Sequence, residues 1–457
     1  MNDNAESHVS LESFGYRQEL KRTLSLFDLL VYGLVFIVPG APIAVLGIVF
    51  NASKGMVPLV YLIGLVAMLF TALSYMEMSR AFPVAGSVYA YAARSLGPTI
   101  GFFAGWAILL DYLLLPTLIY VVCAIAIHAL LPGVPQPVWV VSILVLCTII
   151  NYFGIETTAR TNVVLLVLQL IILALFFVEG LFALGHHAGG AHFSFAPLYN
   201  PALVSPQLIF GALSLAVLSF LGFDAISTLS EESRGGSRAI AQATILSLCV
   251  SALLFVLQTW LACLFVLGRT SFAPGEATNA AFYDISQTIG GAWLKFVVAG
   301  PAIVLGGVAG ALAAQAATSR ILFGMARDGK LPRFLAHVHP KRQVPVRAIL
   351  LVAAITLVLG LALVDRLELL TSMVSFGALI GFLLLHVSVI AHFAWRKRSP
   401  RWLAHLVSPA IGFAIIAYVL WNAEANAKIA GGLWLVAGAM LFVVLRLLRR
   451  ATPLPEG

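Results

Sequence analysis

Charged residues are scarce in this chain. Asp, Glu, Lys and Arg make up only 10% of its 457 residues, whereas 61% are hydrophobic, and the mean hydropathy is +1.00. So few charges cannot cover the surface of a water-soluble domain, which excludes the soluble globular classes. Common catalytic patterns are missing too, because the sequence holds no HExxH, no GxSxG and no phosphate-binding loop. A membrane-embedded enzyme is therefore only a remote alternative.

Cysteine and paired metal ligands are also sparse. Three histidines gather between residues 186 and 192, but no carboxylate accompanies them, so a solvated loop is favoured over a metal site. The cysteines stand singly within apolar runs, which predicts neither a disulfide framework nor metal ligation. They are Cys123, Cys147, Cys249 and Cys263. We expect no metal and no cofactor.

Long apolar runs fill most of the chain. A bilayer core of ~30 Å requires about 20 apolar residues in each helix. Twelve runs are long enough, at 26–50, 56–79, 99–131, 137–153, 162–185, 206–230, 238–267, 292–325, 346–364, 369–394, 402–422 and 428–448. They predict an all-α integral membrane protein with twelve transmembrane helices. The polar and then basic start, residues 1–25, predicts a cytoplasmic tail without a cleavable signal peptide.

The formal net charge of +8 alone would suit a nucleic-acid partner, but the positions of the basic residues argue for a membrane. If the chain starts in the cytoplasm, 22 of its 27 Lys and Arg residues fall on the cytoplasmic side. The others are Lys54, Arg269, Lys295, Arg366 and Lys428. This asymmetry follows the positive-inside rule, so we expect both termini, including the tail 449–457, to be cytoplasmic. The predicted location is the plasma (inner) membrane, with a lipid bilayer and no nucleic acid as partner.

The first apolar run is interrupted by Val38-Pro39-Gly40-Ala41-Pro42. Proline lacks an N–H group and collides with the carbonyl one turn earlier, so this stretch cannot continue an α-helix. Unwound backbone inside a bilayer is tolerated only where its polar groups face protein or a watery cavity. We therefore interpret Pro39, Gly40, Ala41 and Pro42 as a candidate binding site. A simple proline kink is the alternative.

The sixth run carries a second interruption. Gly222 stands between Phe220 and Phe223, and Asp224 follows, which makes poor lipid-facing material. Helices 1 and 6 are five spans apart and therefore run in opposite directions. Two interrupted helices in corresponding places predict an inverted repeat with a site between them at the bilayer midplane. The N-terminus of a half-helix there suits an anion, and the exposed carbonyls suit a cation.

Helix 3 holds an ionisable residue, Asp111, beside Tyr112 in an otherwise apolar run. Such a group costs ~2.5–3.5 kcal/mol on insertion scales, so we expect it to face the bundle interior with a partner. Asp111 either binds a cationic group or a proton, or it forms a hydrogen bond to a neighbouring helix as internal glue. Tyr112 would then line the site.

Three segments together resemble the amino acid–polyamine–organocation transporters. They are Phe220-Leu221-Gly222-Phe223-Asp224, Phe82-Pro83-Val84-Ala85-Gly86-Ser87-Val88-Tyr89, and the stretch from Ser319-Arg320-Ile321-Leu322-Phe323 to Leu331-Pro332. The resemblance covers about residues 20 to 448. Two further strings look closest to the putrescine importer subgroup. These are Leu109-Leu110-Asp111-Tyr112-Leu113 and Thr228-Leu229-Ser230-Glu231-Glu232.

The resemblance implies a LeuT-like five-plus-five inverted repeat, with residues 26–185 and 206–394 as the two halves and residues 402–448 as peripheral helices. It also implies a substrate held against the two breaks. The sequence departs from the family at two positions. Gln169 stands where many amino acid members have a lysine used in proton coupling, and Ala44 stands where putrescine importers carry an acidic residue.

We therefore predict a secondary active transporter that imports a small amine-bearing solute, a putrescine-like polyamine or an amino acid, by proton symport and alternating access. Sodium is less favoured, although Thr318-Ser319 would suit a sodium site in this fold. Asp224 is the first candidate for the coupling group and Asp111 the second. The predicted substrate-binding residues are Pro39, Gly40, Ala41, Pro42, Tyr112, Phe220, Gly222, Phe223 and Asp224. A neutral amino acid permease or exchanger and a passive channel are the alternatives.

Overall fold

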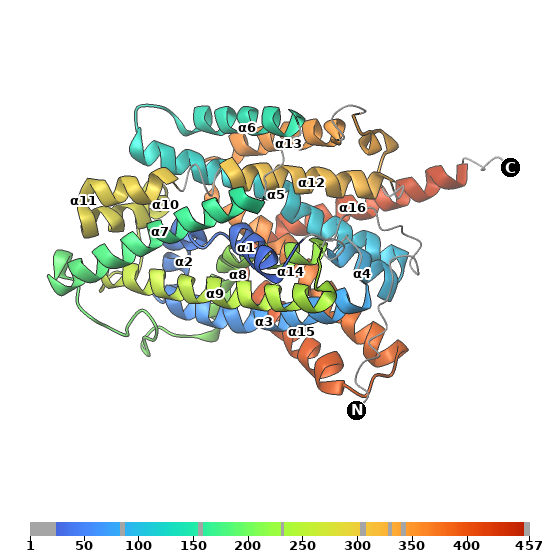
Figure 1. Cartoon of the computed structure of the whole chain (residues 1–457), viewed down its shortest axis with the longest axis horizontal. Coiled ribbons are helices and arrows are strands. Elements are labelled where there is room, and N and C mark those ends of the chain that lie inside the picture. Colours follow the sequence, from blue (N-terminus) through green and yellow to red (C-terminus); the bar gives the residue numbers. More distant parts are fainter. Residues whose placement is uncertain are drawn as a thin grey trace.

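The computed structural model describes residues 24–82, 87–153, 159–229, 233–301, 308–327, 331–339 and 344–451. Within these ranges the chain forms helices and no strand, apart from an isolated bridge between Leu24 and Ser233. Figure 1 shows most of the long helices running roughly side by side. The all-α prediction is confirmed.

The helices have the following bounds. The first half of the chain contains α1 (Leu26–Ile37), α2 (Ala41–Ser53), α3 (Val57–Ala81), α4 (Ser87–Ser95), α5 (Pro98–Leu130), α6 (Gln136–Phe153), α7 (Ala159–Gly185), η2 (Ala188–Gly190), α8 (Pro206–Phe220) and η3 (Phe223–Leu229). The second half contains α9 (Gly236–Leu264), α10 (Glu276–Asn279), α11 (Ala281–Pro301), α12 (Ala309–Arg327), η5 (Arg333–Ala336), α13 (Val346–Leu363), α14 (Leu367–Val389), η6 (Ile390–Arg396), η7 (Leu403–Val407), α15 (Ser408–Trp421) and α16 (Ala425–Ala451).

Nine of the described helices are long and apolar enough to cross a membrane, and the bent pair α1 and α2 makes a tenth. The chain is thus a multi-pass membrane protein. Two predicted spans have a different form. The sixth consists of the short apolar helix α8 followed by the 3-10 helix η3. The eighth is shared between α11 and α12, and residues 302–307 between them lie outside the described part. The count of twelve stays a prediction.

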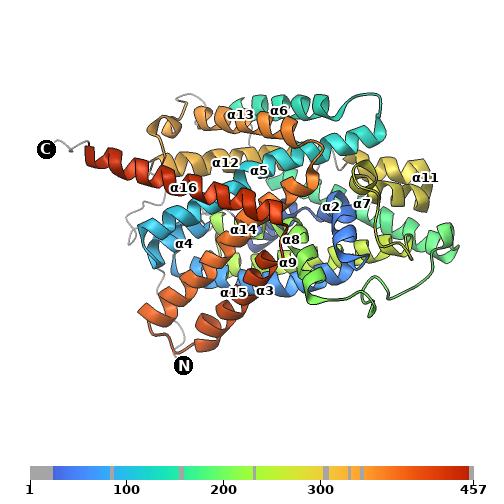
Figure 2. The ribbon, with the colours of Figure 1, turned by 180° about the vertical axis from the view of Figure 1, so that it is seen from behind.

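Two sets of helices pack around the breaks (Figures 1 and 2). In one set α3 and α1 pack against α9, and α2 packs against α8. In the other set the long helix α5 packs against α14 and α12. Gly377 of α14 allows the closest approach there, because a Cβ atom at this position would lie 2.8 Å from the backbone nitrogen of Asp111. Small residues at such contacts are how helices associate where lipid offers no hydrophobic drive.

One end of the bundle is marked by the short helix α4, and we call it the α4 end (Figure 1). Helix α4 has nine residues, Ser87–Ser95, and connects α3 to the long helix α5. Residues 83–86 before it lie outside the described part. The opposite end carries α10, and there a Cβ at Gly55 would lie 3.5 Å from the carbonyl oxygen of Arg269.

Candidate functional site

The break in the first span is real and short. Helix α1 begins at a capping box, in which Ser25 and Asp28 satisfy each other's backbone N–H groups, and it ends at Ile37. Val38 then has φ 60°, which is unfavourable for a β-branched residue and persists only where the surroundings fix it. Helix α2 starts at Ala41, directly after Pro39 and Gly40.

Two residues of the predicted break lie inside a helix instead. Ala41 and Pro42 form the first turn of α2, where the missing N–H of proline costs nothing. The N–H of Ala41 donates to the carbonyl of Val38 at 2.7 Å, and that of Ile43 donates to Gly40 at 2.9 Å. The axes of α1 and α2 differ by 43°. This bend and the helix restart exclude a plain proline kink within one continuous helix.

A glutamine that the sequence analysis missed holds this break. Gln258 of α9 is fully buried, and its Nε2 donates to the carbonyl oxygen of Pro39 at 2.9 Å and to that of Leu254 at 3.1 Å. Its Oε1 is buried without a hydrogen-bond partner in the described part of the chain. One unwound carbonyl of helix 1 is therefore satisfied by a neighbouring helix. The available signal was an amide in the middle of an apolar run.

The break in the sixth span touches the first. Helix α8 ends at Phe220, and Gly222 has φ 114° before η3 begins. A Cβ at Gly222 would lie 2.5 Å from the Phe36 ring and 2.9 Å from the Phe36 carbonyl carbon. Glycine is thus required here for its backbone conformation and for the contact with α1. The Gly222 N–H donates to Oδ1 of Asp224 at 3.2 Å, which fixes the carboxylate at the break.

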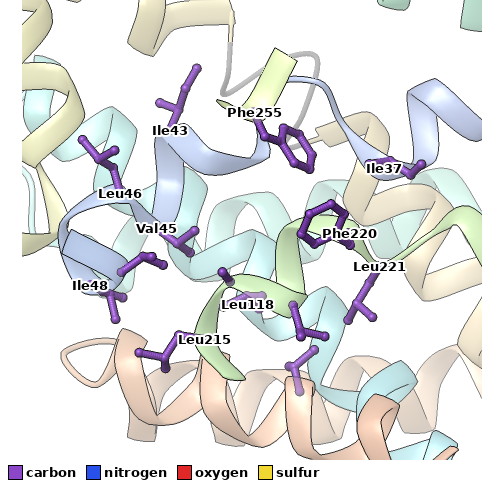
Figure 3. Close-up of a cluster of buried hydrophobic side chains, with 14 of the residues drawn as sticks. Ile37, Ile43, Val45, Leu46, Ile48, Leu118, Leu215, Phe220, Leu221 and Phe255 are labelled. Carbon is purple, nitrogen blue, oxygen red and sulfur yellow. The ribbon is translucent and has the colours of Figure 1, made fainter. Parts of the chain in front are cut away.

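Aromatic rings lie on both sides of Gly222. On one side the Phe220 ring is 5.8 Å from Tyr61 and 5.4 Å from Phe255, and Tyr61 shares a hydrogen bond of 2.8 Å with Ser219. Figure 3 shows Phe220 and Phe255 between Ile37 and Ile43, which flank the helix 1 break. We call Tyr61, Phe220 and Phe255 the outer aromatic layer.

The inner aromatic layer, Tyr75, Phe223 and Phe382, lies on the other side of Gly222. The Phe223 ring is 5.8 Å from Tyr75 and 5.8 Å from Phe382, and the last two rings are 6.2 Å apart. Both layers include a tyrosine of α3, and these are 14 residues or ~21 Å apart along that helix. Aromatic rings therefore close the breaks from both ends of the bundle.

Two carboxylates belong to the same site. Asp111 and Asp224 are each only 6% exposed. Tyr75, Asp111 and Tyr112 lie near Asp224, and the Tyr75 hydroxyl shares a hydrogen bond of 3.3 Å with Ser87 of α4. No Lys, Arg or His within the described ranges forms an ion pair with either carboxylate. Oδ1 of Asp111 is buried and has no hydrogen-bond partner there. An unmatched buried charge is costly, so this pair of acids is poised to take up a cation or a proton.

Two other positions that the sequence singled out, Thr318 and Gln169, differ in their surroundings. The Thr318 hydroxyl lies within hydrogen-bond distance of the Ala314 carbonyl of its own helix and of the Tyr112 carbonyl of α5. Its hydrogen bonding is therefore satisfied by the protein. Gln169 is 7% exposed, and neither amide atom of its side chain has a partner among the described residues. Two hollows on the described surface lie along the outer faces of α13 and α16, away from the breaks.

Two broken helices in contact, with buried acids and aromatic layers beside the breaks, are the arrangement of a secondary transporter. The chain belongs to the amino acid permease family, whose model matches residues 37–441. It is accordingly a transporter rather than an enzyme, and its fold is the LeuT-like fold of that family.

Several known transporters are similar over nearly their whole length. The low-affinity putrescine importer PlaP of Escherichia coli K12 is 33% identical over 439 residues, covering 92% of this chain and 93% of that protein. The branched-chain amino acid permease BcaP of Bacillus subtilis is 28% identical over 408 residues, with 84% and 83% covered. A methylthioribose transporter of Bacillus subtilis is 26% identical over 460 residues, with 93% of each chain covered. Relatives that carry polyamines and amino acids support a transporter of small amine solutes.

Proposed function

We propose that this protein imports a small dicationic amine of the putrescine type by proton symport and alternating access. The observation that carries the proposal is the pair of buried carboxylates, Asp111 and Asp224, which have no ion-pair partner among the described residues. Similarity to a protein named as a putrescine importer supports the same solute.

A diamine would complement the charges of this site. One ammonium group would lie between Asp224 and the carbonyls of the helix 1 break, and the other would lie at Asp111. Rings of the inner aromatic layer and Tyr112 would hold the ammonium groups by cation–π contacts and pack against the methylene stem. Ala44 stands where putrescine importers carry an acidic residue, and Asp111 of α5 would supply the second carboxylate in its place.

Asp224 is our candidate for the coupling group. Its carboxylate is fixed on the N–H of Gly222 and reaches Tyr75 of the inner aromatic layer. For symport the proton and the solute must be bound in the same state, so Asp224 would be protonated while the diamine is bound, and its carbonyl oxygen would still accept from the ammonium. The proton would also lower the cost of burying this group. Gain and loss of that proton at the break would link solute binding to a rearrangement of α8 and η3.

We propose the same membrane orientation as before. Both termini would be cytoplasmic in the inner membrane, and the α4 end would be the cytoplasmic end, since it gathers most of the basic residues. Residues 26–185 and 206–394 would form the two inverted repeats, with α15 and α16 peripheral.

A neutral amino acid is the second candidate solute. The N-terminus of α2 has no side-chain cap at Gly40, so its N–H groups suit the carboxylate of a zwitterion. Against it, that carboxylate would lie close to Asp224 and Asp111, and like charges repel.

The test is uptake by proteoliposomes containing the purified full chain. Labelled putrescine is compared with a panel of neutral amino acids, each with and without an inward proton gradient. We expect gradient-driven accumulation of putrescine. Uptake of an amino acid alone would replace the solute, accumulation independent of the gradient would remove proton symport, and mere equilibration would indicate a channel.

A further inference from the structure

The turn between α14 and α15 stands apart from the bundle. Figures 1 and 2 show these two helices projecting sideways from the rest of the protein at the α4 end. Residues 395–403 form the tip, where the π-helical segments η6 and η7 approach each other. Such segments are rare, and they occur frequently at functional sites. The projecting tip is therefore a candidate binding surface.

Large apolar side chains lie on the exposed surface of the tip. Trp395 is 70% exposed, Trp402 is 60% exposed and Leu403 is 60% exposed. Tryptophan is enriched at the membrane–water boundary, where its ring meets the acyl chains and its N–H meets the headgroups. The tip also contacts the end of the bundle, since Nη1 of Arg396 donates to the Arg94 carbonyl of α4 at 3.0 Å. This hydrogen bond holds the tip against the α4 end of the bundle.

The tip has an excess of positive charge. Its basic side chains are Arg396, Lys397, Arg398 and Arg401. Within the described ranges, one ion pair joins the tip to a carboxylate. Arg401 lies 3.1 Å from Glu77 of α3, which is buried. His405 and Arg80 also contact Glu77, at 3.1 Å and 3.6 Å. The first three basic side chains of the tip therefore have no carboxylate partner in the described part of the protein.

We propose that residues 395–403 bind the headgroup of an anionic phospholipid. The phosphate would lie against Lys397 and Arg398, with Trp395 and Trp402 at the boundary of the acyl chains. The occupant follows from the charge of the tip and from its exposed tryptophans, which a water-soluble anion would leave in water.

Lipid binding would also reach the transport site. Arg401 and His405 hold Glu77, which lies two residues from Tyr75 of the inner aromatic layer on the same helix. A lipid that orders the tip would thereby order the end of α3. This consequence rests on the proposed function, so the first test measures binding and needs no transport.

The test is quenching of tryptophan fluorescence by brominated lipids in vesicles that contain the full chain. Brominated phosphatidylglycerol is compared with brominated phosphatidylcholine at equal mole fractions. We expect stronger quenching by the anionic lipid, and we expect Trp395→Phe with Trp402→Phe to remove that excess. Lys397→Gln with Arg398→Gln should weaken the apparent affinity for phosphatidylglycerol, measured from the quenching curve, roughly thirtyfold, since each basic residue near the surface contributes about 1 kcal/mol.

The matched control is Arg366→Gln with Lys428→Gln, which removes two basic residues from the opposite end of the bundle and should leave the preference intact. Size-exclusion profiles check that each variant is folded. Equal quenching by the two lipids, or a preference that survives Lys397→Gln with Arg398→Gln, would overturn the proposal. Loss of the preference on adding inorganic phosphate would overturn it too, in favour of a soluble anion.

Discussion

The substitution Asp111→Asn tests whether this site binds both ammonium groups of a diamine, one at Asp224 and the other at Asp111. The amide keeps the size of the side chain and removes its charge. At about 4 Å and an effective dielectric constant of about 20, an ammonium and a carboxylate attract by about 4 kcal/mol. Breaking one partner from a buried pair costs about 3–5 kcal/mol. Taking the lower value of about 3 kcal/mol, affinity for a diamine should fall roughly 150-fold.

The assay compares two solutes that share a four-carbon stem. Putrescine has an ammonium at each end, whereas butylamine has one, which Asp224 and the break carbonyls would hold. In proteoliposomes Asp111→Asn should raise the KM for putrescine far more than the KM for butylamine. Asp284→Asn is the control, since that carboxylate is 57% exposed and pairs with Lys295 at 3.0 Å.

An equal change in both KM values would refute this reasoning, because Asp111 would then support the site without contacting the second ammonium. An unchanged KM for putrescine would refute it as well. Thermal unfolding of the purified variant separates these results from loss of fold.

Three other substitutions test the remaining parts of the site. Asp224→Asn should abolish the dependence of uptake on the proton gradient, measured as accumulation with and without it, and preserved dependence would move the coupling elsewhere. Gly222→Ala should cost about 1–3 kcal/mol through its positive φ, lowering the thermal midpoint, while Gly432→Ala should not, since a Cβ there meets open space. Gln258→Leu should leave the Pro39 carbonyl unpaired at a cost of about 1–3 kcal/mol and slow uptake, and normal uptake would show that the clamp is dispensable.

The breaks could be predicted from the sequence because they depend on local chemistry. Pro39 cannot continue a helix, and Gly222 stands beside aromatic residues and a carboxylate within a span. The start of α2 could not be predicted in this way. A proline such as Pro42 interrupts the interior of a helix but fits well in its first turn, and the sequence alone does not decide between the two. Distant contacts were also out of reach. Nothing in a run of apolar residues shows that Gln258 meets Pro39, or that Oδ1 of Asp111 is left unpaired once α14 packs on α5.

The two aromatic layers differ in how they can open. Tyr61, Phe220 and Phe255 of the outer layer come from α3, α8 and α9, and these helices pack against one another as one set. In the inner layer, Tyr75 and Phe223 come from that set, but Phe382 belongs to α14, which packs most extensively against α5. A shift between the two sets would therefore leave the outer layer whole and pull Phe382 from its partners. In the transport cycle proposed above, opening of the inner layer towards the α4 end would therefore require a relative movement of the two sets.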